Sequence, residues 1–366
     1  MFASLEEYEA PQITHALGSG APLMAPAACM PVLQQLDFLF VGAPARMPAL
    51  TIAGGVLPGG TSVSGAGRDR SAALTRLAGE TAEQLGLRGA PSQARKGARR
   101  VFQDPTAAED TRQIAASDWT GQVDLAVPLG LLPPSADQTS GFSAGLAAHP
   151  DRTSAQSHGA LELLERDAVA LWWAGAHKAV SLGGAQAYAT ARLGPRQGRS
   201  TTLLDVTFDT QVPVVVAVSF DAAGTSFCFG AAARHTVDLA ANAALRELGA
   251  SEFGLTLERD RGSTDDQGDT RWADVVDRQT FEARLISHDA DLEEQTALYP
   301  QPSPVQWAEW LAKHDVCFVE LGQVGDHFHV VKAISPTLQS GRETLLTARF
   351  VDATQGQERP FAGPLY

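Results

Sequence analysis

The chain has 366 residues, of which 44% are hydrophobic and 19% are charged, and this is the composition of a folded globular protein. Its net charge of −14 argues against nucleic acid as the main partner, because duplex binding needs a basic surface. The three cysteines, Cys29, Cys228 and Cys317, are far apart and odd in number, so neither a disulfide framework nor a zinc site is predicted.

The first forty residues show neither the pattern of a signal peptide nor that of a membrane span. The first ten are acidic and lack a basic segment followed by an apolar one, so they do not form a signal peptide. The apolar stretch at 21–40 contains prolines, glutamines and an aspartate and is not expected to cross a bilayer. The sequence therefore predicts a cytoplasmic protein that does not bind a membrane.

Helices and strands are interleaved along the chain, which predicts a mixed α/β fold. Residues 1–37 are predicted to be an N-terminal lead-in, and strands broken by turns follow, with Gly54-Gly55 as one turn. Asp69 is a plausible N-cap for the first long helix. In chain order, the predicted elements are strands at 38–41 and 50–53, helices at 69–85 and 153–175, strands at 203–208, 212–220 and 225–230, a helix at 237–248, and strands at 316–321 and 327–333.

Two of the predicted helices each carry a pair of glutamates. Glu80 and Glu83 lie in the first helix, and Glu162 and Glu165 lie in the second. Residues three apart share one face of a helix. The second helix is apolar nearly all round and should be buried, where two carboxylates need a cation such as Mg²⁺ or the guanidinium of Arg166 to neutralise them. A solvated helix face is the alternative explanation of either pair.

The segments around both pairs resemble the signatures of the YcaO superfamily. The first signature, a glycine turn and then a helix, is matched by Ser64-Gly65-Ala66-Gly67 and by residues 72–83. The second is matched by residues 141–148 and by the run from His158 to Ala168. Weaker late features match at 331–336 and at the Pro-rich end. The resemblance implies a single compact YcaO-like domain at 38–366, with helices packed on mixed β-sheets.

The resemblance also implies a binding site for ATP and Mg²⁺. In that family the signature glutamates bind Mg²⁺ and ATP phosphates, so Glu80, Glu83, Glu162 and Glu165 are the predicted metal ligands. Arg166 is predicted to pair with phosphate and to act in catalysis, because a guanidinium offers fixed donors.

Further site residues follow from the same resemblance. Gly65 and Gly67, in the glycine turn, and Glu247, which matches a further family glutamate, are predicted to complete the nucleotide site. Pro360, Pro364 and Tyr366, in the Pro-rich C-terminal tail, are predicted to take part in the active site. The alternative for this tail is that its apolar side chains only pack on a neighbouring groove.

Some residues depart from the family pattern. Ala66 replaces a common lysine, Arg76 stands where a serine is usual, and Gln84 stands where an arginine is usual. Ala147 and Ser154 fall where a serine and glutamate motif is expected. A degenerate, non-catalytic member is therefore an alternative. The flanking histidines His149, His158 and His177 are interpreted as surface or capping residues.

The implied activity is that of an ATP-dependent cyclodehydratase, which activates backbone amides of a ribosomally made precursor peptide and forms thiazoline or oxazoline rings. The chain resembles the stand-alone subunits of microcin B17-type synthetases, because it is too short for a fused leader-binding domain. The expected partners are the precursor peptide, an E1-like leader-binding protein and an FMN-dependent dehydrogenase, in a homodimer or a heterocomplex. A thioamide- or amidine-forming YcaO enzyme and a non-enzymatic adaptor subunit are the alternatives.

Overall fold

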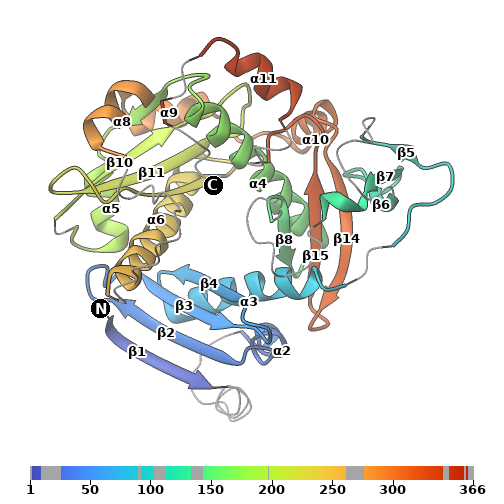
Figure 1. The fold of residues 1–366 in the computed structure, drawn as a ribbon, viewed down its shortest axis with the longest axis horizontal. Helices are drawn as coiled ribbons and strands as arrows, with labels where there is room; N and C mark the ends of the chain where they lie inside the picture. Colours follow the sequence, from blue (N-terminus) through green and yellow to red (C-terminus); the bar gives the residue numbers. More distant parts are fainter. Residues whose placement is uncertain are drawn as a thin grey trace.

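The computed structural model describes residues 2–9, 26–89, 92–102, 113–132, 143–196, 198–260, 276–340, 346–357 and 360–361. Three β-sheets and the helices between them make up these ranges (Figure 1). The mixed α/β fold predicted from the sequence is confirmed.

The first sheet is antiparallel, with its strands in the order β1-β2-β3-β4. The strands are β1 (Phe2–Glu9), β2 (Phe38–Pro44), β3 (Thr51–Val56) and β4 (Ser62–Gly67). β1 lies in the predicted lead-in, yet it pairs with β2, and Glu6 lies 2.6 Å from Arg70 at the start of α3 (Arg70–Gly86). The short helices η1 (Ala27–Cys29) and α2 (Met30–Leu33) follow β1. β1, at the start of the lead-in, is therefore part of the first sheet.

The second sheet has the strand order β12-β11-β10-β9-β13, with only β13 parallel to its neighbour. The strands are β9 (Ala179–Leu182), β10 (Arg199–Asp205), β11 (Val214–Asp221), β12 (Cys228–Ala233) and β13 (Ile286–Ala290). The helices of this part of the chain are α5 (Ala185–Leu193), α6 (Val237–Asp260), α8 (Arg278–Leu285) and α9 (Leu292–Leu298). The three predicted strands are confirmed as β10, β11 and β12, whereas α6 extends well beyond the predicted end at 248.

The third sheet has the order β5-β7-β6-β14-β15-β8. The strands are β5 (Arg99–Arg100), β6 (Gln113–Ser117), β7 (Asp124–Pro128), β8 (Leu146–His149), β14 (Cys317–Val324) and β15 (Phe328–Ile334). Its neighbours in sequence are η3 (Leu129–Leu131), α4 (Arg152–Trp173), α10 (Pro304–Lys313) and α11 (Ala348–Thr354). The predicted strand pair near the C-terminus is confirmed as β14 and β15, joined by a turn in which Gly325 has a φ of 62°.

Three long helices each pack against two of the sheets. α3 contacts β4 of the first sheet and β8 and β15 of the third; α4 contacts β8 and β15 and also β12 of the second; α6 contacts β12 and also β4. The helices therefore close a ring around the centre of the molecule (Figure 1). Each helix packs against a different pair of sheets, and polar side chains on its remaining face line the centre of the molecule.

α4 forms where the sequence predicts it. The side chain of Asp151 caps it by accepting a hydrogen bond from the backbone N–H of Ser154. Apolar residues on most of its sides, from Ala155 to Trp173, are buried between the second and third sheets. Because so little of this helix reaches solvent, any charge on its remaining face lies in a protein environment.

The predicted glycine turn at 64–67 is a strand, β4. A Cβ on Gly65 would lie 2.4 Å from the backbone nitrogen of Leu77, and one on Gly67 would lie 2.5 Å from that of Ala73. These glycines therefore let α3 pack directly on β4. Gly54-Gly55 likewise lies inside β3 instead of a turn, because neighbouring side chains fill the space of both missing Cβ atoms.

Candidate functional site

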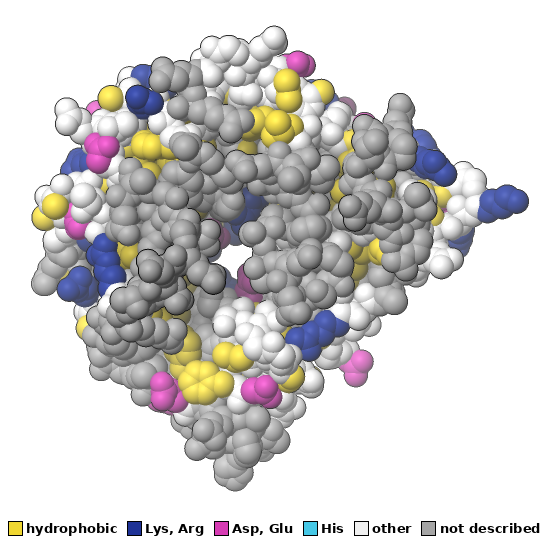
Figure 2. All heavy atoms as spheres, viewed as in Figure 1, with side chains coloured by type: hydrophobic (Ala, Val, Ile, Leu, Met, Phe, Trp, Pro, Cys, Tyr) yellow, Lys and Arg dark blue, Asp and Glu magenta, His cyan; other side chains and the backbone are white. Residues whose placement is uncertain are grey.

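A cavity of about 1110 Å³ lies at the centre of the helix ring. Its charged lining comes mainly from one face of each helix: Arg76, Glu80 and Glu83 on α3; Glu162, Glu165 and Arg166 on α4; Arg246 and Glu247 on α6. On α3, Glu80 lies four residues after Arg76 and three before Glu83, and on α4, Glu165 and Arg166 lie three and four residues after Glu162; these spacings place side chains on a common helix face. Figure 2 shows acidic and basic side chains beside the central opening. The two predicted glutamate pairs therefore meet in one cavity.

The carboxylates of this cavity form what we call the glutamate wall, which consists of Glu80, Glu83, Glu162, Glu165 and Glu247. Burial raises the pKa of Glu165 to about 8, and the neighbouring Glu247 adds to the rise. Burial, together with Glu162, raises the pKa of Glu80 to about 7. The pKa of Glu83 is raised well above its ordinary value, and that of Glu247 is raised, again chiefly by burial. The wall therefore favours a bound cation in place of protons.

The members of the wall differ in their contact with solvent. Glu165 is 5% exposed, whereas Glu80 and Glu247, which also line the cavity, are exposed. Because cavity water solvates Glu80 and Glu247, we expect them to be less desolvated than Glu165. Burial therefore acts more strongly on Glu165 than on Glu80 or Glu247.

Arg166 lies within the glutamate wall. Its Nη2 atom is 3.3 Å from Oε1 of Glu162, and its Nε atom is 3.9 Å from Oε1 of Glu165. Its charge lowers the pKa of Glu165 and Glu247, but by less than burial raises the pKa of either group. One guanidinium therefore does not neutralise the wall.

A second group, which we call the arginine wall, consists of Arg76, Arg234 and Arg246, and the sequence analysis did not assign it to the site. Burial lowers the pKa of Arg246 to about 10, and Arg76 and Arg234 lower it further by repulsion. Within the described residues, no carboxylate forms an ion pair with any of the three. The arginine wall thus offers guanidinium donors to an anion such as a phosphate chain.

The residues of the two walls fit a magnesium-bound nucleotide. Hard carboxylate oxygens suit Mg²⁺, which usually takes one or two protein carboxylates and fills its remaining positions with phosphate oxygens and water. Among the described residues, no three His, Cys, Asp or Glu side chains are close enough to hold a metal ion by themselves. The donor set therefore suits a metal ion that arrives with phosphate oxygens.

The other predicted site residues fall in different places. Gly65 lines the cavity, whereas Gly67 packs against α3 and is not part of the lining. Pro360 is buried outside the cavity lining, and its carbonyl accepts a hydrogen bond of 3.1 Å from Nη1 of Arg284. Pro364 and Tyr366 lie outside the described residues.

The three histidines near α4 do not share one role. His149 and His158 line the cavity, with their ring centroids 5.4 Å apart. His149 also serves the local backbone, since its Nδ1 atom accepts a hydrogen bond from the N–H of Asp151. Burial and then the charge of Arg234 lower the pKa of His158 to about 4, so this imidazole is neutral near pH 7. His177 stacks on Phe208 and lies outside the lining.

The Glu165→Gln variant should become more stable than the wild type as the pH rises, with no nucleotide added. Because the pKa of Glu165 is raised from 4.5 to about 8, the folded wild type holds a proton that the unfolded chain has lost. This contribution to stability falls between about pH 4.5 and about pH 8, by at most about 1.4 kcal/mol per pH unit. Glutamine has no proton to lose. Melting temperatures of both proteins across this range measure the effect, and a difference that is independent of pH would contradict it.

Comparisons with known proteins identify the family. The family model described as "YcaO cyclodehydratase, ATP-ad Mg2+-binding" matches residues 64–339. That match contains both predicted signatures and Glu247, and ATP and Mg²⁺ are the ligands of this family. Among proteins with curated functions, none matches this sequence. No helix in the described part of the chain has the length and hydropathy needed to span a bilayer.

Several solved structures share the fold. The YcaO protein from Methanopyrus kandleri, bound with AMPPCP and Mg²⁺, is 18% identical with a TM-score of 0.62, over 84% of this chain and 88% of that one. The E. coli microcin synthetase McbBCD complex with pro-MccB17 bound has a chain that is 13% identical with a TM-score of 0.65, over 89% of this chain and 97% of that one.

A heterocyclase in complex with substrate and cofactor is 16% identical with a TM-score of 0.60. The match covers 91% of this chain but only 52% of the heterocyclase. These similarities support the fold, and the family model covers most of the chain. The chain belongs to the YcaO family.

Proposed function

We propose that the cavity binds MgATP between the glutamate wall and the arginine wall. The enzyme then transfers the γ-phosphoryl group to backbone amides of a ribosomally made precursor peptide. The products are thiazoline or oxazoline rings. The observation that carries the proposal is that one cavity collects both walls from three helices and from Arg234, which directly follows β12. The YcaO protein from M. kandleri, which shares the fold, is bound with AMPPCP and Mg²⁺.

In the proposed reaction, the Sγ or Oγ atom of a substrate Cys, Ser or Thr loses its proton to solvent and attacks the preceding carbonyl carbon. The carbonyl oxygen takes the γ-phosphoryl group of ATP and then leaves as phosphate, while the amide nitrogen loses its proton. One ATP becomes ADP and phosphate, and the peptide loses the elements of one water. The protein contributes positioning and charge neutralisation, with no covalent step of its own.

The two walls divide this work. Carboxylates from the set Glu80, Glu83, Glu162 and Glu165, together with phosphate oxygens, would hold Mg²⁺, which when bound neutralises phosphate charge. The arginine wall would hold the phosphates, since its guanidinium groups have no carboxylate partner among the described residues. Arg166 would orient the transferred phosphate, because it lies among the glutamates that would carry the metal.

We also propose how the chain is divided and which partners it has. The division is into a lead-in at 1–37 and a YcaO-like domain at 38–366 with a Pro-rich tail. The partners are the precursor peptide, an E1-like leader-binding protein and an FMN-dependent dehydrogenase. The similarity to a chain of the McbBCD complex, which has pro-MccB17 bound, supports a partner-dependent enzyme.

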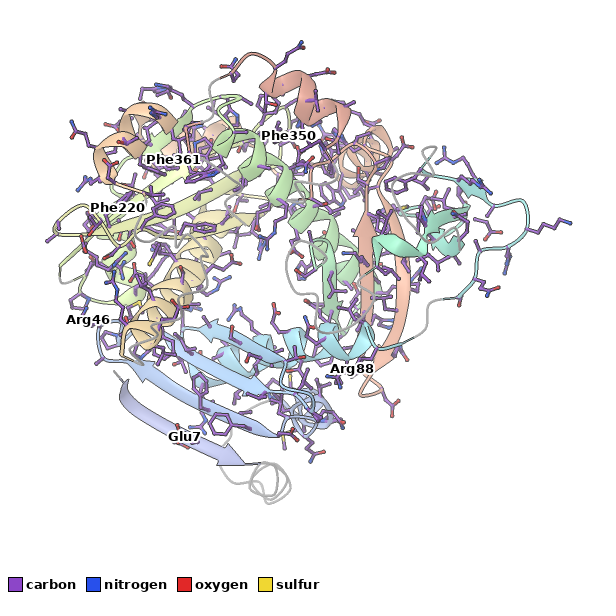
Figure 3. All side chains as sticks on the ribbon, viewed as in Figure 1. Glu7, Arg46, Arg88, Phe220, Phe350 and Phe361 are labelled. Carbon is purple, nitrogen blue, oxygen red and sulfur yellow. The ribbon has the colours of Figure 1, made fainter. Side chains whose placement is uncertain are left out.

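The described start of the tail is anchored to the core. Phe361 stacks on Trp173 with ring centroids 4.8 Å apart, and Figure 3 labels it over the second sheet. Trp173 ends α4, roughly 12 Å along the helix axis from Glu165 at about 1.5 Å per residue. The described start of the tail is therefore held at the end of the helix that carries the second glutamate pair.

Deleting residues 363–366 should leave the melting temperature and nucleotide binding unchanged and should remove most ring formation. The deletion spares the Pro360 and Phe361 anchor, so stability should not change. Calorimetry and peptide mass spectrometry on the same sample measure both outcomes. Phe361→Ala is the control and should lower the melting temperature. Peptide modification at the wild-type rate after the deletion would exclude a catalytic tail.

A reconstituted reaction tests the proposed function. The purified protein is incubated with ATP, Mg²⁺, a Cys/Ser-rich precursor peptide and an E1-like partner protein. The proposal expects the peptide to lose one water per ring, with one phosphate released for each. A product carrying sulfur or nitrogen in place of the amide oxygen would favour thioamide or amidine formation. No ATP turnover with all partners present would favour an adaptor.

A further inference from the structure

The segment at 143–149, which leads into and forms β8, is clamped between α4 and β15. Gly145 has a φ of 81°, and a Cβ on it would lie 2.3 Å from the carbonyl oxygen of Ala333. A Cβ on Gly159 of α4 would lie 2.6 Å from the carbonyl oxygen of Gly145. The N–H of Ala333 also donates a hydrogen bond of 2.7 Å to that same oxygen. The two glycines thus allow the segment to lie directly between helix and strand.

This segment holds one member of each glutamate pair. The N–H of Gly145 donates to Oε2 of Glu162 on α4, at 3.2 Å. The N–H of Ala148 donates to Oε1 of Glu83 on α3, at 3.1 Å. β8 is an edge strand of the third sheet, so its outer N–H groups are available for such contacts. The relative positions of Glu83 and Glu162 therefore depend on where this segment lies.

Lys332 of β15 fastens the segment from the other side. Its side chain is buried, with 4% of the residue exposed, and its Nζ atom donates a hydrogen bond of 2.6 Å to the carbonyl oxygen of Ala144. A lysine is almost never fully buried unless it is paired. The charge of Lys332 also acts on Glu83, where it opposes the effect of burial on the pKa of that carboxyl. A buried cation thus links the segment to the glutamate wall, although Lys332 does not line the cavity.

We propose that Lys332 is a positioning residue for the nucleotide site: by holding the Ala144 carbonyl, it fixes the segment whose N–H groups aim Glu83 and Glu162 into the cavity. This inference rests on the proposed function. It goes beyond that function because Lys332 acts through the two glutamates and touches neither metal nor nucleotide.

Two measurements on each variant test this role. Hydrogen exchange at residues 144–148 reports whether the segment is held. Titration with AMPPCP at a series of Mg²⁺ concentrations reports the Mg²⁺ needed for half-maximal nucleotide binding. For Lys332→Met we expect faster exchange and at least a tenfold higher Mg²⁺ requirement, because both glutamates lose their fixed position. Lys332→Arg, which keeps a charged donor, should restore most of the exchange protection at 144–148 and most of the wild-type Mg²⁺ requirement.

Arg196→Met is the matched control. Arg196 is another buried cation, paired with Glu252, and neither residue lines the cavity. The control should lower the melting temperature and leave the Mg²⁺ requirement of the folded protein unchanged. If Lys332→Met does not fold, the same two measurements are made on Gly159→Ala. The added Cβ of this variant displaces the same segment without removing a charge.

The possible outcomes separate the two proposals. If the wild type shows no Mg²⁺-dependent binding of AMPPCP, the proposed function is wrong. A wild type that binds, together with a Lys332→Met or Gly159→Ala protein that shows faster exchange at 144–148 and an unchanged Mg²⁺ requirement, would overturn the inference about Lys332 alone. Unchanged exchange in folded Lys332→Met would overturn it as well.

Discussion

Replacing both Glu162 and Glu165 by glutamine should abolish Mg²⁺-dependent nucleotide binding while the protein stays folded. Loss of residues that only support metal ligands costs about 10–100-fold in metal affinity, so loss of two ligands should cost at least about 100-fold. Glutamine keeps the shape of the side chains and removes the repulsion that helps to raise the pKa of Glu165. The melting temperature without nucleotide should therefore hold or rise near pH 7.

Isothermal titration with AMPPCP, with and without Mg²⁺, measures this effect. The matched control is Glu293→Gln with Glu294→Gln, which changes the net charge equally on the exposed start of α9. The control should bind as the wild type does. Equal affinity of the wild type and the Glu162 and Glu165 double variant would show that these carboxylates are not the metal ligands.

Arg166→Lys should keep the fold and lose most ATP consumption, by about 10²–10³-fold, which is the usual effect of removing one donor to a developing charge. Lysine retains the positive charge beside Glu162 and Glu165 but lacks the planar fork of donors. A thermal melt and a phosphate-release assay on the same sample, with partners present, measure stability and turnover separately.

Arg278→Lys is the control for this substitution, because Arg278 pairs with Glu282 at the same helical spacing on an exposed helix. It should change neither quantity. Full ATP consumption by Arg166→Lys would mean that Arg166 only neutralises the glutamates around it.

The glutamate wall could be predicted from the sequence because its chemistry is local. Each pair has helical spacing, and the apolar surroundings of α4 indicated that Glu162 and Glu165 would lie in a protein environment. The structure adds that both pairs meet in one cavity, together with Glu247 from α6. The sequence spacing of the glutamates and their position in the structure therefore agree for the glutamate wall.

The arginine wall could not be predicted in the same way, because it is assembled only by tertiary structure. Arg76, Arg234 and Arg246 come from α3, from the end of β12 and from α6, which are brought together when three helices bridge three sheets. Arg76 drew notice only as a departure from the family pattern. The available signals were that it lies one helical turn before Glu80 and that Arg246 directly precedes Glu247.

Glycine and strand assignments failed where packing overrides local preference. Gly65 and Gly67 indicated a turn, but they lie in β4 because α3 needs the space of their missing side chains. β1 was not predicted as a strand; it lies within the predicted lead-in and forms the edge of the first sheet by pairing with β2. Strand pairing is a long-range property that neither segment reveals alone.

Determining the structure with Mg²⁺ and AMPPCP bound tests the central claim most directly. We expect the nucleotide to occupy the central cavity, with Mg²⁺ on carboxylates of the glutamate wall. We expect Arg166 and members of the arginine wall to contact the phosphates. A nucleotide bound elsewhere on the protein, with both walls free of Mg²⁺ and phosphate at saturating concentrations, would contradict the account.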